Sequence, residues 1–344
     1  MLKEFKGYRK GVDLGGWLSQ CNHTKERYET FITEKDVETV ASWGADHVRI
    51  PVDYDLVEDK EGNYKEDGFD YIQRAIDWCG KYGLNMVLDV HKTFGYSFDI
   101  GENEEGFFEN EKYQERFYRL WEEFARRYSK YEERLVFELL NEVTDKSYSD
   151  KWNEISYKCI ERIRKIAPTI KILVGGYWNN SPEAVKDLAM PYDENIVYNF
   201  HDYDPLVFTH QGASWIPDMP ADYRVSIDKT FRQMDAYTRE KAPALLERFD
   251  NMGDSDEKID AEFFKKRFEE PVRIAQERGV ALYCGEYGVI ENAEAGDILK
   301  WYKAINAAFE YYGIGRATWS YKSMDFGLSD ARLDGVRDEL LKYI

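Results

Sequence analysis

Two glutamates stand at the ends of apolar segments that are typical of buried strands. Glu142 follows the segment VFELLN, and Glu286 closes the segment ALYCGE. Two carboxyl groups on either side of one bond can hydrolyse a glycosidic linkage, because the protonated group supplies a proton to the departing oxygen while the ionised group attacks the sugar or activates water. Either glutamate alone could equally be a surface residue or a charge in the first turn of a helix, so the interpretation depends on the neighbouring residues.

The residues near these two glutamates include a third carboxylate that could take a catalytic role, and two glycines. Glu138 lies in the middle of the first apolar segment, where side chains are buried for packing, so we expect a structural role for it. Gly285 and Gly288 flank Glu286. Glycine in or beside a strand indicates close approach of a ligand or of another backbone, and here we expect a ligand.

Other residue types suited to binding a sugar or orienting a carboxylate stand at the ends of similar segments. They are Arg49, His91, Asn141, His201, Tyr203 and Trp319. For the two histidines the alternative is a buried side chain with its hydrogen bonds satisfied, and for Trp319 it is a place in the apolar core. Arg49 could form a structural ion pair, a role that is compatible with holding a catalytic carboxylate.

The elements that must position these residues follow a repeated pattern of amphipathic helix, glycine and short apolar strand. It recurs around Gly44, Gly83, Gly279 and Gly313. Glycine just past a helix supplies the left-handed conformation that ends it, and the following apolar run is typical of a buried parallel strand. Eight strands are predicted, near residues 11–15, 46–51, 85–91, 135–141, 171–175, 196–201, 281–286 and 315–320. They indicate an α/β protein with a (β/α)₈ TIM barrel, in which reactive groups gather at the C-terminal strand ends; a doubly wound sheet is the alternative.

Local signals predict some helix starts and one insertion. Thr33 with Asp36 resembles a capping box, and Ser181 before Pro182 is typical of a capping residue at a helix start. Almost sixty residues separate the sixth strand from a helix beginning near Asp260, far more than the usual loop of about 2–6 residues. We therefore expect one catalytic domain over residues 1–344 with an inserted subdomain or lid at about 204–259.

Several aromatic and amide residues outside the strand ends are further candidates for substrate contact. The insertion carries Phe208, His210, Trp215 and Tyr223, for which packing within the insertion is an equal alternative. Trp178, Asn179 and Asn180 follow the fifth strand and are candidates for the leaving-group side, with ordinary loop roles as the alternative.

Composition excludes several classes of function. The 344 residues carry a formal net charge of −19, which opposes binding to nucleic acid and to anionic membranes. The four cysteines are far apart and without a C-x-x-C pair, so neither a zinc site nor a disulfide framework is expected. No run of apolar residues is long enough to span a membrane. We expect a soluble monomer without metal or cofactor, either cytoplasmic or secreted with its signal peptide absent from this sequence.

The same segments resemble those of glycoside hydrolase family 5. The matching pieces are GVDLGGW, HVRIP, LDVH, FELLNE, YNFHDY, CGEYG and TWSY, and they cover essentially the whole chain. Within the family, the sequence is similar to the clostridial endoglucanases of the C type, which also have an insertion after the sixth strand.

The resemblance implies a role for each site residue. Glu286 would be the nucleophile, kept ionised by Arg49 and the hydroxyl of Tyr203. Glu142 would be the acid/base, and the charge of Glu286 would raise its affinity for a proton. The remaining roles are a hydrogen bond to the sugar 2-hydroxyl for Asn141, orientation of the sugar or the carboxylates for His91 and His201, and an aromatic floor for Trp319.

The activity that the resemblance implies is that of a retaining endo-β-1,4-glucanase acting on a cellulose-like or mixed-linkage β-glucan polysaccharide or oligosaccharide. An exo-β-1,3-glucanase is the first alternative, since GVDLGGWL also resembles the start of those enzymes, and a β-mannanase is the second. A sugar-binding barrel without activity is less consistent with the presence of both glutamates. A metal-dependent hydrolase would require clustered ligands, for example H-x-H after the first strand, where this chain has LGGW.

Overall fold

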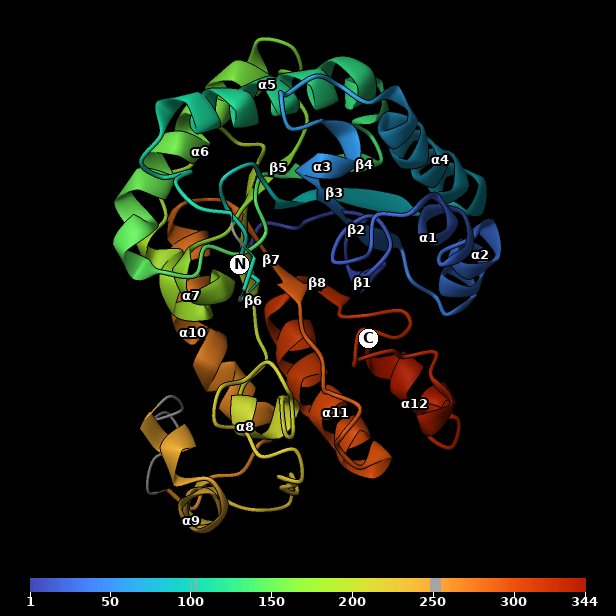
Figure 1. Ribbon diagram of the computed structural model, residues 1–344. Coiled ribbons are helices and arrows are strands. Elements are labelled where there is room, and N and C mark those ends of the chain that lie inside the picture. The colour runs from blue at the N-terminus through green and yellow to red at the C-terminus, as the bar shows by residue number, and fades with distance from the viewer. Residues whose placement is uncertain (100, 103, 248–254) are drawn as a thin grey trace.

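Eight parallel strands close into a barrel in chain order in the computed structural model, which describes residues 1–99, 101–102, 104–247 and 255–344 (Figure 1). β1 pairs with both β2 and β8, and this closure excludes the doubly wound sheet. The strands are β1 Lys10–Asp13, β2 His47–Asp53, β3 Asn85–Lys92, β4 Leu135–Glu138, β5 Ile172–Val174, β6 Ile196–His201, β7 Ala281–Glu286 and β8 Gly315–Thr318. The predicted TIM barrel is confirmed.

Helices surround the barrel and alternate with its strands (Figure 1). The α-helices of the described residues are α1 Lys25–Thr30, α2 Glu34–Ser42, α3 Tyr54–Val57, α4 Glu66–Tyr82, α5 Glu111–Tyr128, α6 Ser149–Arg164, α7 Tyr177–Asn180, α8 Leu206–Thr209, α9 Phe231–Lys241, α10 Ala261–Glu277, α11 Ala295–Tyr312 and α12 Arg337–Leu340. Short 3₁₀ helices are η1 Ser129–Tyr131, η2 Lys146–Tyr148, η3 Pro182–Asp187, η4 Pro243–Glu247, η5 Ala331–Leu333 and η6 Leu341–Tyr343.

The predicted helix boundaries are correct, but one expected side-chain hydrogen bond is missing. Gly83 and Gly313 end α4 and α11 in the left-handed conformation, as expected for glycine at a helix end. The Asp36 carboxylate accepts hydrogen bonds from the Thr33 backbone N–H and hydroxyl, as in a capping box. Ser181 is the N-cap residue of η3 and Pro182 begins the helix, as predicted, and only the capping hydrogen bond expected from the Ser181 side chain is missing.

The interior of the barrel is built in layers because alternate residues of a strand point to the same side. One apolar cluster contains Val87 of β3, Val136 of β4 and Val197 of β6, together with Phe5 and Tyr8 from the N-terminal segment. Two residues further along the same strands stand Asp89, Glu138 and Asn199, all fully buried. A polar layer therefore lies directly above the apolar one, towards the C-terminal ends of the strands.

The segment between β6 and α10 contains α8, α9 and η4 and packs beside α11. Asp297 of α11 accepts hydrogen bonds from the Ser226 hydroxyl and the Ile227 backbone N–H. Phe208 and Tyr223 are buried within this segment. The predicted insertion, residues 204–259, includes residues 248–254, which lie outside the described residues.

Two further features concern the state of the cysteines and the character of the helices. All four cysteines belong to the described residues and are free thiols, and all except Cys21 are buried. In the described part of the chain, none of the helices combines the length and the apolar character that crossing a bilayer requires.

Candidate active site

A cavity of about 580 Å³ opens at the C-terminal ends of the strands. It is lined by Glu142, Glu286, His91, His201, Tyr203 and Trp319, six of the eight predicted site residues, and by residues of the loops around them. The other two, Arg49 and Asn141, are fully buried; Arg49 contacts Glu286, and Asn141 contacts Arg49. The fold thus brings all eight residues into one site.

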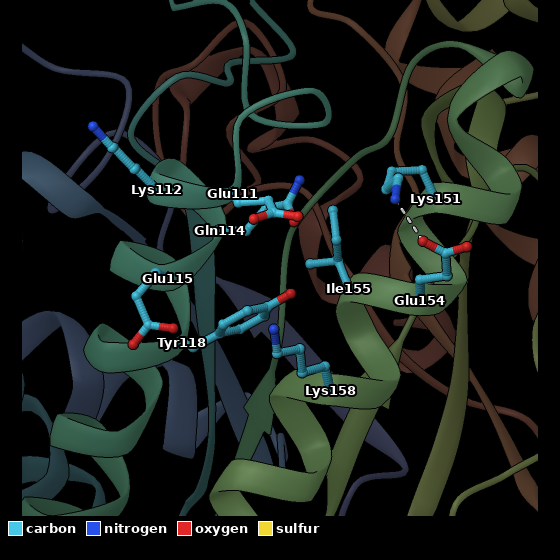
Figure 2. Close-up of a pocket in the computed structure, with 9 residues that line it drawn as sticks. All are labelled: Glu111, Lys112, Gln114, Glu115, Tyr118, Lys151, Glu154, Ile155 and Lys158. Carbon is cyan, nitrogen blue, oxygen red and sulfur yellow. Dashed lines mark hydrogen bonds and ion pairs between the residues drawn. The ribbon is translucent and has the colours of Figure 1, made fainter.

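A second hollow, between α5 and α6, has a similar volume of about 550 Å³ (Figure 2). Its walls carry lysines and glutamates such as Lys151 and Glu154, which pair with each other. Its buried amide, Gln114, donates to the backbone oxygens of Phe107 and Phe108. The Lys151–Glu154 pair and the Gln114 amide thus have partners within the protein, and none of the eight predicted site residues lines this hollow.

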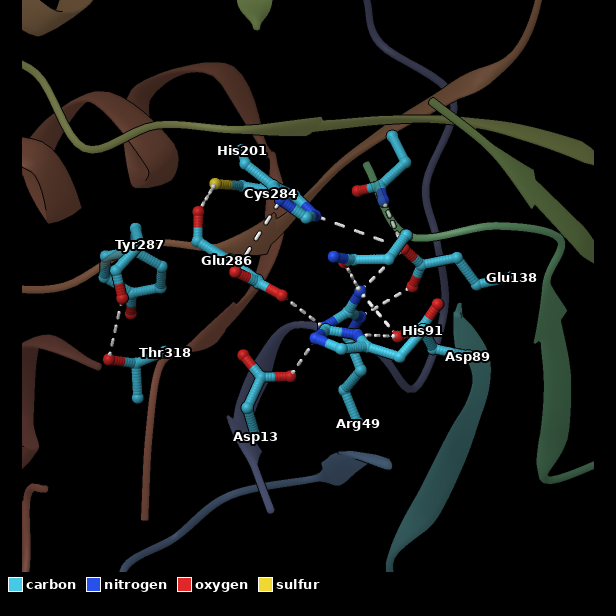
Figure 3. A network of polar contacts seen from close by, with 12 residues as sticks. Asp13, Arg49, Asp89, His91, Glu138, His201, Cys284, Glu286, Tyr287 and Thr318 are labelled. Carbon is cyan, nitrogen blue, oxygen red and sulfur yellow. Dashed lines mark hydrogen bonds and ion pairs between the residues drawn. The ribbon is translucent and has the colours of Figure 1, made fainter. Parts of the chain in front are cut away.

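Glu286, at the end of β7, is held by a cation and a hydroxyl. Arg49 Nη1 lies 2.7 Å from Glu286 Oε1 (Figure 3), and the Tyr203 hydroxyl donates to Oε2 over 2.9 Å. Both groups donate to the carboxylate, one to each oxygen. One oxygen is thus fixed from β2 and the other from the loop after β6, which orients the carboxylate towards the cavity.

Arg49 is shared between Glu286 and a buried set of acidic residues. Its Nε and Nη2 donate to Glu138 over 2.6 and 2.9 Å, and Asp89 and Asp13 lie 3.0 and 3.4 Å away (Figure 3). Arg49 therefore forms the structural ion pairs considered from the sequence and also contacts Glu286. Glu138 ends β4 rather than lying in mid-strand, but it belongs to the polar layer below the cavity and is structural as predicted.

The involvement of Asp89 and Asp13 in this network was missing from the sequence analysis. The signal was present in the two-residue alternation of the strands, since Asp89 follows Val87 by two positions in β3 and both side chains must point into the barrel.

Glu142 follows β4 and has surroundings that differ from those of Glu286. Oε1 lies 2.8 Å from His201 Nδ1, and Oε2 accepts from Asn179 Nδ2 over 2.6 Å. Burial raises the pKa of Glu142, opposed by the Asn179 hydrogen bond and by the charges of His91 and Arg49. The sequence analysis attributed this rise to the charge of Glu286, and that cause was wrong.

His201 remains uncharged near neutral pH. Burial lowers its pKa to about 4, in spite of the opposing effect of Glu286. A neutral imidazole beside Glu142 does not take up the proton of the carboxyl group, and its ring can donate or accept depending on the tautomer. His201 thus orients Glu142 without neutralising it.

The two glutamates approach each other closely across the cavity. One oxygen of Glu142, one oxygen of Glu286 and one nitrogen of His201 all lie within 4.8 Å of one another. Glu142, whose pKa is raised by burial, therefore lies close to Glu286, which is held by Arg49 and Tyr203.

Asn141 has one amide atom without a partner among the described residues, and Trp319 lines the cavity. Asn141 Oδ1 accepts from Arg49 Nη2 over 2.8 Å, while its Nδ2 is buried and has no hydrogen-bond partner among the described residues. The Trp319 ring is parallel to His91 at 5.8 Å and covers Gly15, where an added Cβ would meet the ring at 2.6 Å. His91 is held in turn by Asp89 at 2.6 Å.

The glycines beside Glu286 pack against protein rather than against a ligand. A Cβ at Gly285 would lie 2.8–2.9 Å from the Asn199 and His201 side chains, and one at Gly288 would lie 2.4 Å from the backbone oxygen of Trp319. The expectation of ligand approach at these positions was wrong, because the neighbouring strands themselves occupy the space.

Only some of the residues proposed for substrate contact in the segments after β5 and β6 line the cavity. His210 and Trp215 line it, whereas Phe208 and Tyr223 are buried in packing. After β5, Trp178 lines the cavity with 51% of its surface exposed. The two residues after Trp178 bind residues that follow β4: Asn179 donates to Glu142, and Asn180 donates to the backbone oxygen of Asn141.

Among the residues that the structure describes, two groups of side chains have the spacing of a cation site. One consists of Glu142, His201 and Glu286, and the other of His23, Asp53 and Asp55. Each already contains a protein cation: Arg49 lies at Glu286, and Lys92 Nζ lies 3.8 and 3.9 Å from Asp53 and Asp55. These amino-acid cations supply the positive charge that the carboxylates require.

Comparison with known proteins gives matches over most of the chain. The model of the family Cellulase (glycosyl hydrolase family 5) matches residues 10–325. Cellodextrinase A of Ruminococcus flavefaciens is 48% identical over 316 residues, covering 92% of this chain and 86% of the relative. Endoglucanase C of Acetivibrio thermocellus is 38% identical over 342 residues, covering 98% of both chains. The crystal structure of the cellulose synthase subunit Z from Clostridioides difficile superposes with a TM-score of 0.77 at 27% identity, covering 98% of this chain and 99% of that one.

Proposed function

Because the chain belongs to the cellulase family, glycosyl hydrolase family 5, and is a glycoside hydrolase, we propose that it is a retaining endo-β-1,4-glucanase of cellulose-like or mixed-linkage β-glucans. The observation that carries this proposal is the pair Glu142 and Glu286, with oxygens within 4.8 Å of each other and with different surroundings. Retaining enzymes separate their two carboxyl groups by about 5–5.5 Å and inverting enzymes by about 6.5–9.5 Å. The close approach favours a direct attack by one carboxylate over activation of an intervening water.

In the first step, ionised Glu286 attacks the anomeric carbon while Glu142 transfers its proton to the departing oxygen. The bond to the leaving group breaks and an ester between the sugar and Glu286 forms. Burial supports the role of Glu142, since it raises the pKa of that carboxyl group and keeps it protonated to higher pH.

In the second step, Glu142 accepts a proton from water, which attacks the anomeric carbon and releases Glu286. Two inversions give net retention of configuration. The free Nδ2 of Asn141 is placed to donate to the sugar 2-hydroxyl, and Trp319 and His91 form the floor on which the sugar lies. These proposed roles are supported by the unpartnered Nδ2 of Asn141 and by the position of Trp319 and His91 in the lining of the cavity.

The substrate class is supported by the relatives, whose names describe a cellodextrinase and an endoglucanase. An exo-β-1,3-glucanase and then a β-mannanase remain the alternatives. The proposal takes residues 1–344 as one catalytic domain with an insertion at about 204–259, acting as a monomer without metal or cofactor.

Product analysis on barley β-glucan, carboxymethyl cellulose, laminarin and mannan tests the proposal. A rapid fall in viscosity and mixed oligosaccharides from the first two are expected, with activity unchanged by EDTA. Glucose as the sole product from laminarin would establish the exo-β-1,3 alternative, and preference for mannan would establish the other. Loss of activity with EDTA would contradict catalysis by the two glutamates alone.

Replacing Asn179 by alanine is expected to move the alkaline limb of the pH profile upwards. The Asn179 amide stabilises the ionised form of Glu142 and so lowers its pKa; without it the pKa rises. Because a general acid acts in its protonated form, activity then persists to higher pH, by about one unit for a hydrogen bond to a charged group. The measurement is kcat/KM against pH on cellotetraose.

Asn63→Ala is the matched control for this experiment. Asn63 Nδ2 donates to Asp59 over 2.9 Å in an exposed amide–carboxylate pair, so its loss should leave the profile unchanged. An alkaline limb that stays in place or moves to lower pH in Asn179→Ala would contradict the assignment of Glu142.

A further inference from the structure

The segment that carries Glu142 has an irregular backbone, although it bears one of the two proposed catalytic groups. Strand β4 ends at Glu138, and η2 begins at Lys146. Between them the chain belongs to no helix or strand, so its backbone groups lack the hydrogen bonds that regular elements supply. Buried backbone groups are almost always paired, and other parts of the protein must therefore supply the partners of this segment.

One of these partners is the hydroxyl group of Tyr96, in the loop after β3. It donates to the backbone oxygen of Glu142 over 2.7 Å and accepts from the backbone N–H of Thr144 over 2.9 Å. Among the described residues, no other group donates to that backbone oxygen of Glu142. A single hydroxyl therefore bridges the backbone on both sides of Val143 and fixes the segment on which the Glu142 side chain stands.

The Tyr96 side chain is itself held firmly. It is buried, and its ring packs edge-on against Phe108 with the ring centroids 5.1 Å apart. The backbone of Tyr96 pairs with that of Thr93 in both directions, over 2.9 and 3.1 Å. Burial raises the pKa of Tyr96 to about 12, so the hydroxyl keeps its proton near neutral pH and always has one to donate.

Tyr96 does not line the cavity, whereas Phe98 and Asp99 of the same loop do. Its hydroxyl makes its hydrogen bonds to the segment of Glu142 and Thr144. An effect of Tyr96 on catalysis must therefore pass through the position of Glu142.

The carboxyl group of Glu142 is held separately from its backbone. Its two oxygens contact His201 Nδ1 at 2.8 Å and Asn179 Nδ2 at 2.6 Å. These two contacts set the direction of the carboxyl group, and the Tyr96 hydroxyl sets the place from which the side chain projects. Glu142 is thus held at both ends, by residues that follow β3, β5 and β6.

We propose that Tyr96 is a positioning residue for the acid, holding the backbone of Glu142 where its carboxyl group reaches the departing oxygen. The inference rests on the proposed function and deepens it. Proton transfer requires the two heavy atoms to be within hydrogen-bond reach, and a displacement of about 1 Å can lower a rate by about 100-fold. Glu286 is held independently, by Arg49 and Tyr203, so loss of the Tyr96 hydroxyl should impair the acid and leave the nucleophile in place.

Three substrates with the same cellobiosyl group separate this role from others. Cellotetraose has a sugar leaving group and phenyl β-cellobioside a poor aryl one, and both need a proton from the acid; 4-nitrophenyl β-cellobioside releases its leaving group without a proton. We expect Tyr96→Phe to lower kcat/KM on the first two by about tenfold to 100-fold, and on the third by less than about threefold. The ratio kcat/KM is the appropriate quantity because it reports the steps up to formation of the ester.

A double-mutant cycle shows whether Tyr96 acts through Glu142. Residues that act as a unit have strongly non-additive effects. In a Glu142→Ala background there is no carboxyl group left to position, so adding Tyr96→Phe should change kcat/KM on phenyl β-cellobioside by less than about threefold.

Tyr128→Phe is the matched control. The Tyr128 hydroxyl is buried and donates to the backbone oxygen of Phe69 over 2.9 Å, so its removal also breaks a bond from a tyrosine to a backbone oxygen. Tyr128 ends α5 and does not line the cavity. Its replacement should lower the melting temperature without selecting among the three substrates.

Each other outcome contradicts the positioning role. Equal losses of Tyr96→Phe on all three substrates, or a variant that does not fold, would show that the residue is structural. Full additivity with Glu142→Ala would show that Tyr96 acts independently of the acid. Failure of the proposed function itself is visible separately, because the unchanged protein would then cleave none of the three substrates.

Discussion

Replacement of Glu286 by glutamine is expected to lower kcat by about 10⁴-fold or more on every substrate, because an amide cannot form the ester intermediate. The carboxylate is oriented through both oxygens, by Arg49 and by Tyr203. Glutamine is nearly the same size and can keep a hydrogen bond to one of these partners, so the loss reports chemistry rather than collapse of the site. Steady-state rates on 4-nitrophenyl β-cellobioside and cellotetraose measure it.

Covalent trapping provides the control for the Glu286 substitution. A 2-fluoro cellobioside with a dinitrophenolate leaving group should inactivate the unchanged protein, releasing dinitrophenolate and adding one 2-deoxy-2-fluorocellobiosyl group to Glu286, as found by mass spectrometry of peptides. The Glu286→Gln variant should remain unlabelled. Attachment of the sugar to another residue would contradict the assignment of the nucleophile.

Replacement of Glu142 by alanine is expected to have an effect that depends on the leaving group. General acid catalysis contributes about 10²–10⁴-fold, and this amount should be lost on cellotetraose and phenyl β-cellobioside. Formation of the ester from 4-nitrophenyl β-cellobioside needs no proton and should be largely retained. The physical basis is the raised pKa that burial gives to Glu142, which keeps it protonated when the substrate binds.

Azide tests the second role of Glu142. A small anion can enter the space left by the side chain and attack the ester without base assistance, so azide should accelerate turnover of the nitrophenyl substrate by Glu142→Ala and give a β-glycosyl azide. Equal loss on all three substrates, with no effect of azide, would refute the role of Glu142 as acid and base.

The sequence was sufficient to predict the barrel and the strand ends that carry the site. The reason is that helix, glycine and strand recur with a clear local signature, and a parallel barrel gathers every C-terminal strand end at one face. Glu142 follows β4 and Glu286 ends β7, far apart in the chain, yet their places at C-terminal strand ends of a barrel predicted that they face one cavity.

The partners of these residues were harder to predict because they depend on side-chain packing. The Asn179 bond to Glu142 requires the left-handed backbone of Trp178 and Asn179, which no residue type in this segment demands. Gly285 and Gly288 are needed for contacts with neighbouring strands, and these contacts have no signal in a linear sequence.

The ion pairs of Arg267 with Glu183 and Asp202 also had no local signal. Arg267 is one of several charged residues on α10, and only the approach of that helix to the loops after β5 and β6 gives it a position at the cavity. Such long-range ion pairs arise from the tertiary arrangement and are independent of helical periodicity.

The central claim, a double displacement by Glu286 and Glu142, is tested most directly by NMR of the first product formed from cellotetraose. Spectra recorded before mutarotation should show the new reducing end as the β-anomer, in agreement with two carboxyl groups whose oxygens lie within 4.8 Å of each other. Initial formation of the α-anomer would mean that water attacks directly, and it would contradict the ester on Glu286.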